Sequence, residues 1–209
     1  MDEISICCVN VQGIHTSEKR RDVFDRLRNQ NYKIICLTDT HFEKSKENIY
    51  SAEWGYVSYF SSFSSQKRGV AILFRNNFEF KVKNVHRDHQ GNLLILDLEI
   101  EDHRLSLAVL YGPNQDNPNF YQNLQRNILQ LGNQKMIIVG DWNMLLDPEV
   151  DGKNYKHINN PKARLEVLKI ITELNLYDIY RCENSESRLF TWKKNLNQET
   201  YKWVGWISF

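Results

Sequence analysis

Residues 93–111 read LLILDLEIEDHRLSLAVLY and contain two β-like runs, LLILDLEI at Leu93 and LSLAVLY at Leu105, with no helical segment between them. Aliphatic residues dominate both runs, as is typical of buried strands. Two similar runs come earlier in the chain, VSYF at Val57 and GVAILF at Gly69. The middle third of the chain is therefore predicted to be mostly sheet.

Three helices are predicted outside this region, each from apolar residues at helical spacing. The first extends from about Ser17 to Gln30 and separates a short buried strand at Ile4–Asn10 from a second strand at Lys33–Asp39. The other two begin at Pro118 and Pro161, because proline is favoured in the first turn of a helix. Their expected inner faces are Phe120, Leu124, Ile128 and Leu131, and Leu165, Leu168, Ile171 and Leu174.

Strands that come in runs, with helices at only three places, do not fit a regular βαβ alternation. They indicate an α/β protein in which two sheets pack face to face, a two-layer β-sandwich flanked by helices. Two further β-like runs near the end, LFTW at Leu189 and YKWVGWIS at Tyr201, extend this pattern. A length of 209 residues with 41% hydrophobic content is enough for one core, so residues 1–209 are expected to form a single domain.

Composition limits the possible environments and partners. Lys and Arg number 27 against 26 Asp and Glu, so any basic face for nucleic acid must be local. The four cysteines have no C-x-x-C spacing, which favours reduced packing residues and an intracellular protein over a disulfide framework or a zinc site. There is no signal-peptide pattern and no apolar run long enough to span a membrane, so we expect no membrane association.

The sharpest chemical signal is GDWN at residues 140–143, which directly follows the buried strand KMIIV. It places Asp141 and Asn143 where both side chains can reach one polar site. Hydrolysis of a phosphodiester needs an aligned water and neutralisation of phosphate charge, commonly by Mg²⁺ held through carboxylates. An isolated acid at this position is as often a turn or cap residue, so GDWN alone leaves both interpretations open.

Polar residues also end three other predicted strands, namely Asn10, Asp39 within LTDTH, and Tyr111 within LYGPN. A site assembled from strand ends is the natural inference. Taken singly, Asn10 is better explained as a turn former and Tyr111 as an aromatic at the edge of the core, and Asp39 is also explained as a helix or loop cap.

In combination and in order, these segments resemble a known pattern. An Asn after the first strand is followed by LTDTH in place of QETH, then RGVAIL, YGPN, GDWN, NNPKAR and FTW. The chain thus resembles the endonuclease domain of LINE-type (non-LTR) retrotransposons. This domain belongs to the exonuclease–endonuclease–phosphatase superfamily, with the apurinic-site endonucleases and deoxyribonuclease I. The resemblance extends from about Ile4 to Trp192.

The resemblance implies a phosphodiester hydrolase that uses Mg²⁺ (or Mn²⁺) to nick one strand of duplex DNA and leaves a 3′-hydroxyl that a reverse transcriptase domain of the parent protein can extend. It implies that Asn10 and Asp39 belong to the metal shell and that Tyr111 contacts the scissile phosphate. Asp141 and Asn143 would orient the attacking water. The resemblance also implies a monomer that acts in the nucleus.

Two further residues are implied to contact substrate. His41 lies beside the metal residue in LTDTH, and Arg164 lies in NNPKAR near the start of the late helix. Basic residues near the starts of both helices, Lys19, Arg20, Arg21, Lys162 and Arg164, could meet DNA phosphates, although solvated surface charge explains them as well.

The sequence departs from the family pattern in three places. Asp39 replaces the Glu of QETH, no acidic residue follows Glu199, and the chain finishes at Phe209 before a Ser-Asp-His motif. We therefore expect a C-terminally incomplete fold and an endonuclease that is impaired. One alternative is a catalytically inactive DNA-binding remnant of a truncated element; a lesser one is a phosphodiesterase of the same superfamily that acts on another substrate.

Overall fold

The structure, a computed structural model, describes residues 4–133, 135–153 and 159–185, together with the backbone of short strands at 192–194, 200–202 and 207–208. The chain divides into two compact units. The first comprises residues 1–111 and 133–140, and the second comprises residues 112–132 and 141–209. The single domain expected over residues 1–209 stays a prediction.

The first unit contains a four-stranded sheet in the order β1-β2-β4-β3. Strand β1 pairs in parallel with β2, whereas β4 pairs antiparallel with both β2 and β3. All residues of β2 and β4 are buried, which fits their continuous apolar sequences. The strand bounds are Ile6–Asn10 for β1, Ile34–Thr38 for β2, Ser58–Ser61 for β3 and Val70–Phe74 for β4.

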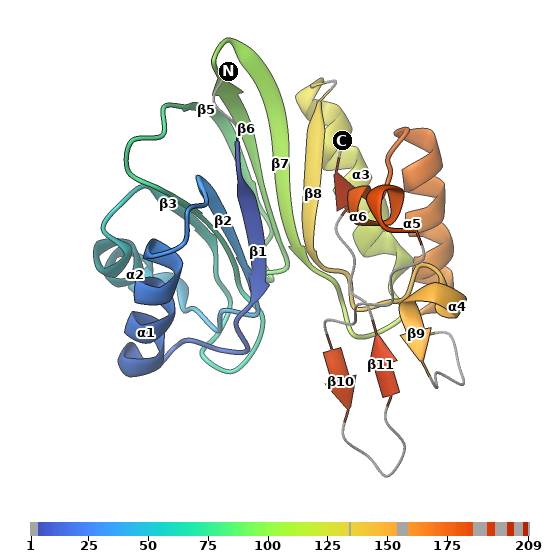
Figure 1. The fold of residues 1–209 in the computed structure, drawn as a ribbon, viewed down its shortest axis with the longest axis horizontal. Coiled ribbons are helices and arrows are strands. Elements are labelled where there is room, and N and C mark those ends of the chain that lie inside the picture. The colour runs from blue at the N-terminus through green and yellow to red at the C-terminus, as the bar shows by residue number, and fades with distance from the viewer. Residues whose placement is uncertain are drawn as a thin grey trace. The chain divides into compact units, whose positions relative to one another are not determined.

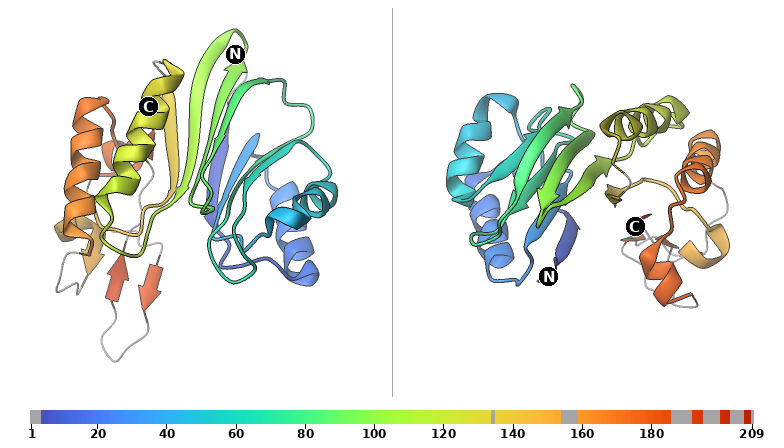
Figure 2. Two further views of the ribbon diagram at one scale, coloured as in Figure 1. Left: turned by 180° about the vertical axis from the view of Figure 1, so that it is seen from behind. Right: turned by 90° about the horizontal axis from the view of Figure 1, so that it is seen from above.

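The second sheet of this unit contains β8, β7, β6 and β5 in that order. The two sheets lie face to face, as the view from above in Figure 2 shows. Strands β6 and β7 pair antiparallel along their whole length, from Leu93↔Leu110 to Ile100↔His103. The bounds are Lys81–Arg87 for β5, Leu93–Ile100 for β6, His103–Tyr111 for β7 and Met136–Asp141 for β8.

Two helices cover the outer face of the first sheet, α1 (Ser17–Arg28) and α2 (Glu47–Trp54), the latter preceded by the short 3₁₀ turn η1 (Lys44–Lys46) (Figure 1). Phe24 of α1 and Trp54 of α2 meet edge to face with ring centroids 5.4 Å apart. Both rings are buried in a cluster with Ile35 and Leu37 of β2 and Leu73 of β4. Removal of this apolar surface from water anchors the helices to the sheet.

The second unit contains the long helices α3 (Pro118–Leu131) and α5 (Pro161–Glu173), which pack against each other. Side-chain hydrogen bonds join them, from Gln122 to Glu166 at 3.1 Å and from Gln125 to Glu173 at 2.8 Å. A small antiparallel sheet has the order β10-β11-β9. The remaining bounds are Pro148–Asp151 for α4, Gly152–Lys153 for β9, Ile179–Glu183 for α6, Trp192–Lys194 for β10, Thr200–Lys202 for β11 and Ile207–Ser208 for β12.

The two-layer β-sandwich flanked by helices is confirmed. The terminal runs at Leu189 and Tyr201 lie largely outside the described residues, and so does the expected C-terminal incompleteness. Helix α2 and strand β5 were not predicted from the sequence. Strand β5 has no apolar run of the kind that predicts a strand, because it is polar and mostly exposed. Its pairing with β6 also has a register shift between Val82 and Asn84.

The predicted inner face of the late helix is wrong. In α5 the buried residues are Ala163, Val167 and Ile170, whereas Leu165 is 64% exposed. The helix carries two overlapping apolar stripes, and spacing alone does not distinguish them. In α3 the buried residues are Tyr121, Leu124 and Ile128, which confirms two of the four predicted positions and leaves Phe120 and Leu131 partly exposed.

The four cysteines are free thiols, and the prediction that they are packing residues holds for the buried Cys36 but is wrong for Cys182, which is exposed. Burial raises the pKa of Cys7 to about 11, so this thiol stays protonated at neutral pH. Among the described residues, no helix combines the length and the apolar character needed to cross a bilayer.

Arg20 is a buried structural residue, so the suggestion that it meets DNA phosphate is wrong. Its Nη2 donates to Glu53 Oε1 at 2.8 Å, its Nε pairs with the other carboxylate oxygen, and its Nη1 donates to the carbonyls of Ile14 and His15. The hydrogen bond from Arg20 lowers the pKa of Glu53 below its ordinary value. This pair joins α1 to α2.

We expect Arg20→Met to lower the free energy of unfolding by about 2–4 kcal/mol, because it leaves the Glu53 carboxylate and a buried carbonyl without their donor. Urea denaturation followed by circular dichroism measures this loss. The matched control is Arg21→Met on the exposed side of the same helix, which should change the stability by less than about 0.5 kcal/mol. Equal effects of the two substitutions would contradict the assignment of Arg20 as a buried structural residue.

Candidate active site

The parallel pairing of β1 with β2 places two predicted site residues at one end of the first unit. Asn10 is in register with Thr38, and Asp39 follows directly. Backbone bonds continue beyond the strands, from Val11 N to Thr38 O at 3.0 Å and from Gly13 N to Asp39 O at 2.7 Å. The loops that carry Asn10 and Asp39 are therefore held together by the main chain.

Asp39 and His41 both have left-handed backbone conformations, with φ of 55° and 58°. His41 Nε2 lies 3.0 Å from Asp39 Oδ1, which also accepts a hydrogen bond from Arg68 N at 3.3 Å. The His41 ring stacks against His15 at 6.4 Å. Left-handed backbone at residues other than glycine is costly and concentrates at functional sites. The Asp39–His41 pair was not predicted from the sequence.

The donor chemistry at this end fits a magnesium ion. Asn10 and Asp39 supply an amide oxygen and a carboxylate, which are ligand types that Mg²⁺ accepts, and Mg²⁺ commonly binds through one or two carboxylates with water or phosphate completing its shell. In the part of the chain that the structure describes, no group of three or more His, Cys, Asp or Glu side chains could hold a metal.

Tyr111 lies at the same end of the first unit. Its backbone N donates to Asn92 O at 2.8 Å, and neighbouring Gly91 accepts from Gly69 N at 2.9 Å. Gly69 O in turn accepts from Thr40 N at 3.0 Å, beside Asp39. This chain of backbone contacts connects the end of β7 to the end of β2. Asn10, Asp39, His41 and Tyr111 therefore all belong to this unit, and their meeting in one site stays a prediction.

Asp141 and Asn143 form a second group, which belongs to the second unit. Asn143 N donates to Asp141 Oδ1 at 2.9 Å, and Asn143 Nδ2 donates to Gly112 O at 2.6 Å. Gly112 N donates to Asp141 O at 2.6 Å, so the loop closes on itself. Asn143 has φ of 52°, a conformation that asparagine tolerates better than most residues. These bonds orient both polar side chains.

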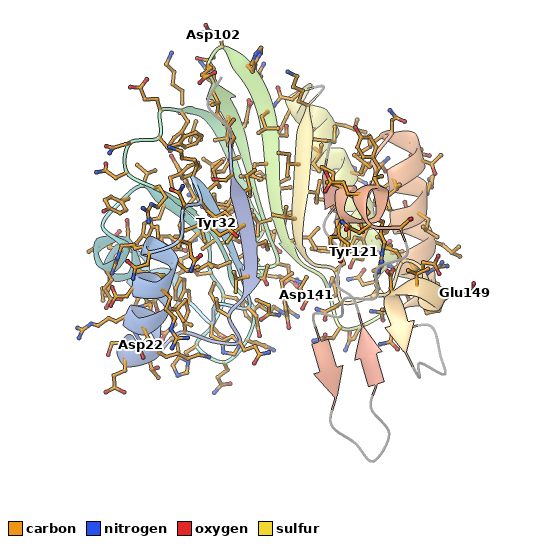
Figure 3. The ribbon with its side chains drawn as sticks, viewed as in Figure 1. Asp22, Tyr32, Asp102, Tyr121, Asp141 and Glu149 are labelled. Atoms are coloured by element: carbon orange, nitrogen blue, oxygen red, sulfur yellow. The ribbon has the colours of Figure 1, made fainter. Side chains whose placement is uncertain are left out.

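Aromatic packing between α3 and Trp142 supports the loop that carries Asp141 and Asn143. The ring of Tyr121 on α3 stacks on Trp142 at 5.9 Å, and its hydroxyl donates to Trp142 O at 2.8 Å. Burial, followed by the charge of Asp141, raises the pKa of Tyr121, so this hydroxyl stays a proton donor. Figure 3 labels Tyr121 and Asp141. This support was not predicted, because only the aromatic character of Tyr121 and Trp142 is visible in the sequence.

The NNPKAR segment anchors the start of α5. Asn160 Nδ2 donates to Asn143 O at 3.2 Å, and Asp116 accepts from Ala163 N at 2.7 Å. Arg164 donates from Nε at 2.8 Å and from Nη2 at 2.5 Å to Leu146 O. The guanidinium of Arg164 therefore helps to hold the loop after Asn143, and its contact with substrate stays a prediction.

Comparison with known proteins identifies the class. The chain matches the Endonuclease/Exonuclease/phosphatase family over residues 7–203 and belongs to this family. It is 25% identical over 196 residues to the Transposon TX1 uncharacterized 149 kDa protein of Xenopus laevis. That match covers 90% of this chain and 14% of the relative, so the chain spans about one seventh of that protein.

Three solved structures with similar folds each match 98% of the chain. The 3′ phosphatase NExo from Neisseria is 17% identical, with a TM-score of 0.72 and 86% of its chain covered. An AP endonuclease from Archaeoglobus fulgidus is 19% identical, with the same TM-score and coverage. The endonuclease domain of the telomere-specific non-LTR retrotransposon TRAS1 is 12% identical, with a TM-score of 0.66 and 84% covered. The resemblance stated from the motifs is confirmed.

Gly140 allows strand β8 to approach strand β7 closely, and only glycine fits at this position. Its φ is 145°, and a Cβ would lie 1.9 Å from Leu110 O. We expect Gly140→Ala to cost about 3 kcal/mol or more, because backbone rather than a flexible side chain must move. Gly132 is the matched control, since it has φ of 67° and open space around it.

Thermal unfolding of the two alanine variants tests this prediction. Gly132→Ala should cost only about 1–2 kcal/mol, the strain of a left-handed alanine. An equal loss in both variants would show that backbone conformation, and not close packing at Gly140, sets the requirement for glycine.

Proposed function

We propose that this chain is the metal-dependent DNA endonuclease domain of a LINE-type retrotransposon, which nicks one strand of duplex DNA. The observation that carries the proposal is the loop in which Asn143 N holds Asp141 Oδ1 while Gly112 O holds the Asn143 amide. A carboxylate and an amide fixed in this way are suited to orient a water molecule. Membership of the family supports the same reaction class.

In the proposed reaction, water attacks the phosphorus, the bond from phosphorus to the 3′ oxygen breaks, and the departing 3′ oxygen takes a proton from solvent water. The products are a 3′-hydroxyl and a 5′-phosphate. Asp141 accepts the proton of the attacking water, and Asn143 orients that water. Asn10 and Asp39 hold the ion, Tyr111 contacts the scissile phosphate, and His41 and Arg164 contact the substrate. When bound, Mg²⁺ (or Mn²⁺) neutralises charge that develops on the phosphate.

The proposed partner is duplex DNA. The NExo structure contains a product DNA hairpin, and the TRAS1 domain comes from a retrotransposon, which supports this choice. The much greater length of the Xenopus relative supports a longer parent protein. We propose, from the resemblance to LINE-type elements, that this parent also carries a reverse transcriptase domain. We propose that the endonuclease domain is monomeric and acts in the nucleus.

We further propose that the activity is impaired at Asp39. The carboxylate is one methylene shorter than the Glu of the family pattern, and its Oδ1 already faces His41 Nε2 at 3.0 Å and Arg68 N at 3.3 Å. A cation must compete with these donors. If these donors exclude the cation altogether, the second candidate is favoured, a domain that binds DNA without catalysis.

Conversion of supercoiled plasmid to open circle, followed with Mg²⁺ present, tests the reaction. We expect slow nicking by the wild type and a loss of about 100-fold or more in Asp141→Ala, because the general base is removed. Asp22→Ala is the control, because Asp22 is exposed on α1 (Figure 3). The Asp22→Ala protein should nick at the wild-type rate. No nicking by a folded wild type would favour the catalytically inactive domain.

Lengthening the carboxylate at residue 39 tests the cause of the impairment. Asp39→Glu should raise the nicking rate by about tenfold and lower the Mg²⁺ concentration at half-maximal rate, because substitutions that disturb a metal's surroundings commonly cost 10–100-fold. The rate is measured across a Mg²⁺ titration for both proteins. A slower Asp39→Glu protein with unchanged Mg²⁺ dependence would show that Asp39 is not the limiting residue.

A further inference from the structure

The loop between β3 and β4 carries an exposed aromatic ring flanked by two cations. Phe63 is 40% exposed, although it is large and apolar. Arg68 Cζ lies 5.2 Å from the centroid of its ring, and Lys67 Nζ lies 5.7 Å from it. We call these three residues the Phe63 cluster.

The Phe63 cluster is held in place by its surroundings. Phe63 N donates to Phe42 O at 3.0 Å, and a bridge between Ser64 and Lys67 closes the turn. Gly91 approaches so closely that a Cβ there would lie 2.8 Å from Phe63 Cβ. Arg68 Nη1 donates to Gln90 Oε1 at 3.0 Å. An exposed ring fixed in this way differs from a single apolar side chain scattered on a surface, which is common and needs no explanation.

The cluster adjoins the residues that we propose for the metal, within the same unit. Arg68 N donates to Asp39 Oδ1 at 3.3 Å, and Arg68 O accepts from His41 N at 2.7 Å. A rigid connection through two backbone groups therefore joins the cluster to the strand end that carries Asp39.

The charge of the cluster is not neutralised by pairing. Within the described ranges, neither Lys67 nor Arg68 forms a salt bridge, whereas Lys81 and Lys83 both pair with Glu99. Cations available on a surface bind phosphates and release counterions from DNA. Apolar side chains that stand between such cations can press between base steps in the minor groove.

We propose that the Phe63 cluster is a contact for duplex DNA, in which Lys67 and Arg68 bind backbone phosphates and the exposed edge of Phe63 wedges against a base step. This inference rests on the proposed function, because it names the residues that position DNA near Asp39. The wedge makes the cluster sensitive to how easily the local base step opens. Phe63 is thus a positioning residue and takes no part in proton transfer.

Binding of a fluorescent duplex, measured by anisotropy in EDTA across a salt series, tests the proposal without requiring catalysis. Phe63→Ala should weaken binding by about tenfold at one salt concentration, in line with the loss of one base contact, and should leave the salt dependence unchanged. Phe63→Trp should restore the affinity. Lys67→Ala and Arg68→Ala should each reduce the slope of log K against log salt by about 0.9.

A second readout reports the wedge itself. Duplexes with 2-aminopurine at successive positions should brighten at one position when the wild type binds, because unstacking relieves quenching, and Phe63→Ala should abolish that signal. Tyr32→Ala and Lys81→Ala are matched controls, an aromatic of similar exposure at 37% and a cation at the start of β5. Both should bind like the wild type.

The outcomes separate the two proposals. If the wild type does not bind duplex DNA, the proposed function fails, and the contact fails with it. If the wild type binds and Phe63→Ala binds equally well with the same 2-aminopurine signal, only the contact is overturned. Weakening by Phe63→Ala together with a parallel loss in Tyr32→Ala would also overturn it, because the effect would not be specific to the cluster.

Discussion

The parallel pairing of β1 with β2, continued by main-chain bonds beyond both strands, is the constraint on which the first unit depends. It requires a crossover, which α1 supplies, and it brings the carboxyl ends of two strands to one edge. The bonds from Val11 to Thr38 and from Gly13 to Asp39 keep the following loops paired where the strands have ended. Asn10 and Asp39 are neighbours for this reason, although 28 residues separate them in the sequence.

The same edge stores local strain. Asp39, His41 and Arg68 all have positive φ, and each participates in the bonds that connect the loops after β2 and before β4. Such conformations persist only where the surroundings hold them. The buried cluster of Phe24, Trp54 and their neighbours beneath this sheet provides a rigid base. A stable core thus makes possible a loop arrangement that the loop sequences alone would not adopt.

Much of this architecture could be predicted from the sequence, because buried strands such as β2, β4 and β6 have continuous apolar runs and α3 and α5 begin at prolines. Strand β5 could not, because its polar sequence reflects an exposed position that depends on pairing with β6. The inner face of α5 was misassigned because contacts from Asp116 and α3 fix its rotation. The site residues followed from motifs, whereas the Asp39–His41 pair depends on backbone conformations that no motif reveals.

The most direct test of the proposed function examines the chemistry of the DNA ends. Plasmid exposed to the protein with Mg²⁺ is repurified and given a DNA polymerase with labelled nucleotides, without any prior treatment of its ends. A nick with a 3′-hydroxyl is extended at once, so the account predicts label in the open circle that is absent with Asp141→Ala. Two results would contradict this proposal. Either the open circles accept label only after a 3′-phosphate is removed, or the Asp141→Ala protein produces as many labelled open circles as the wild type.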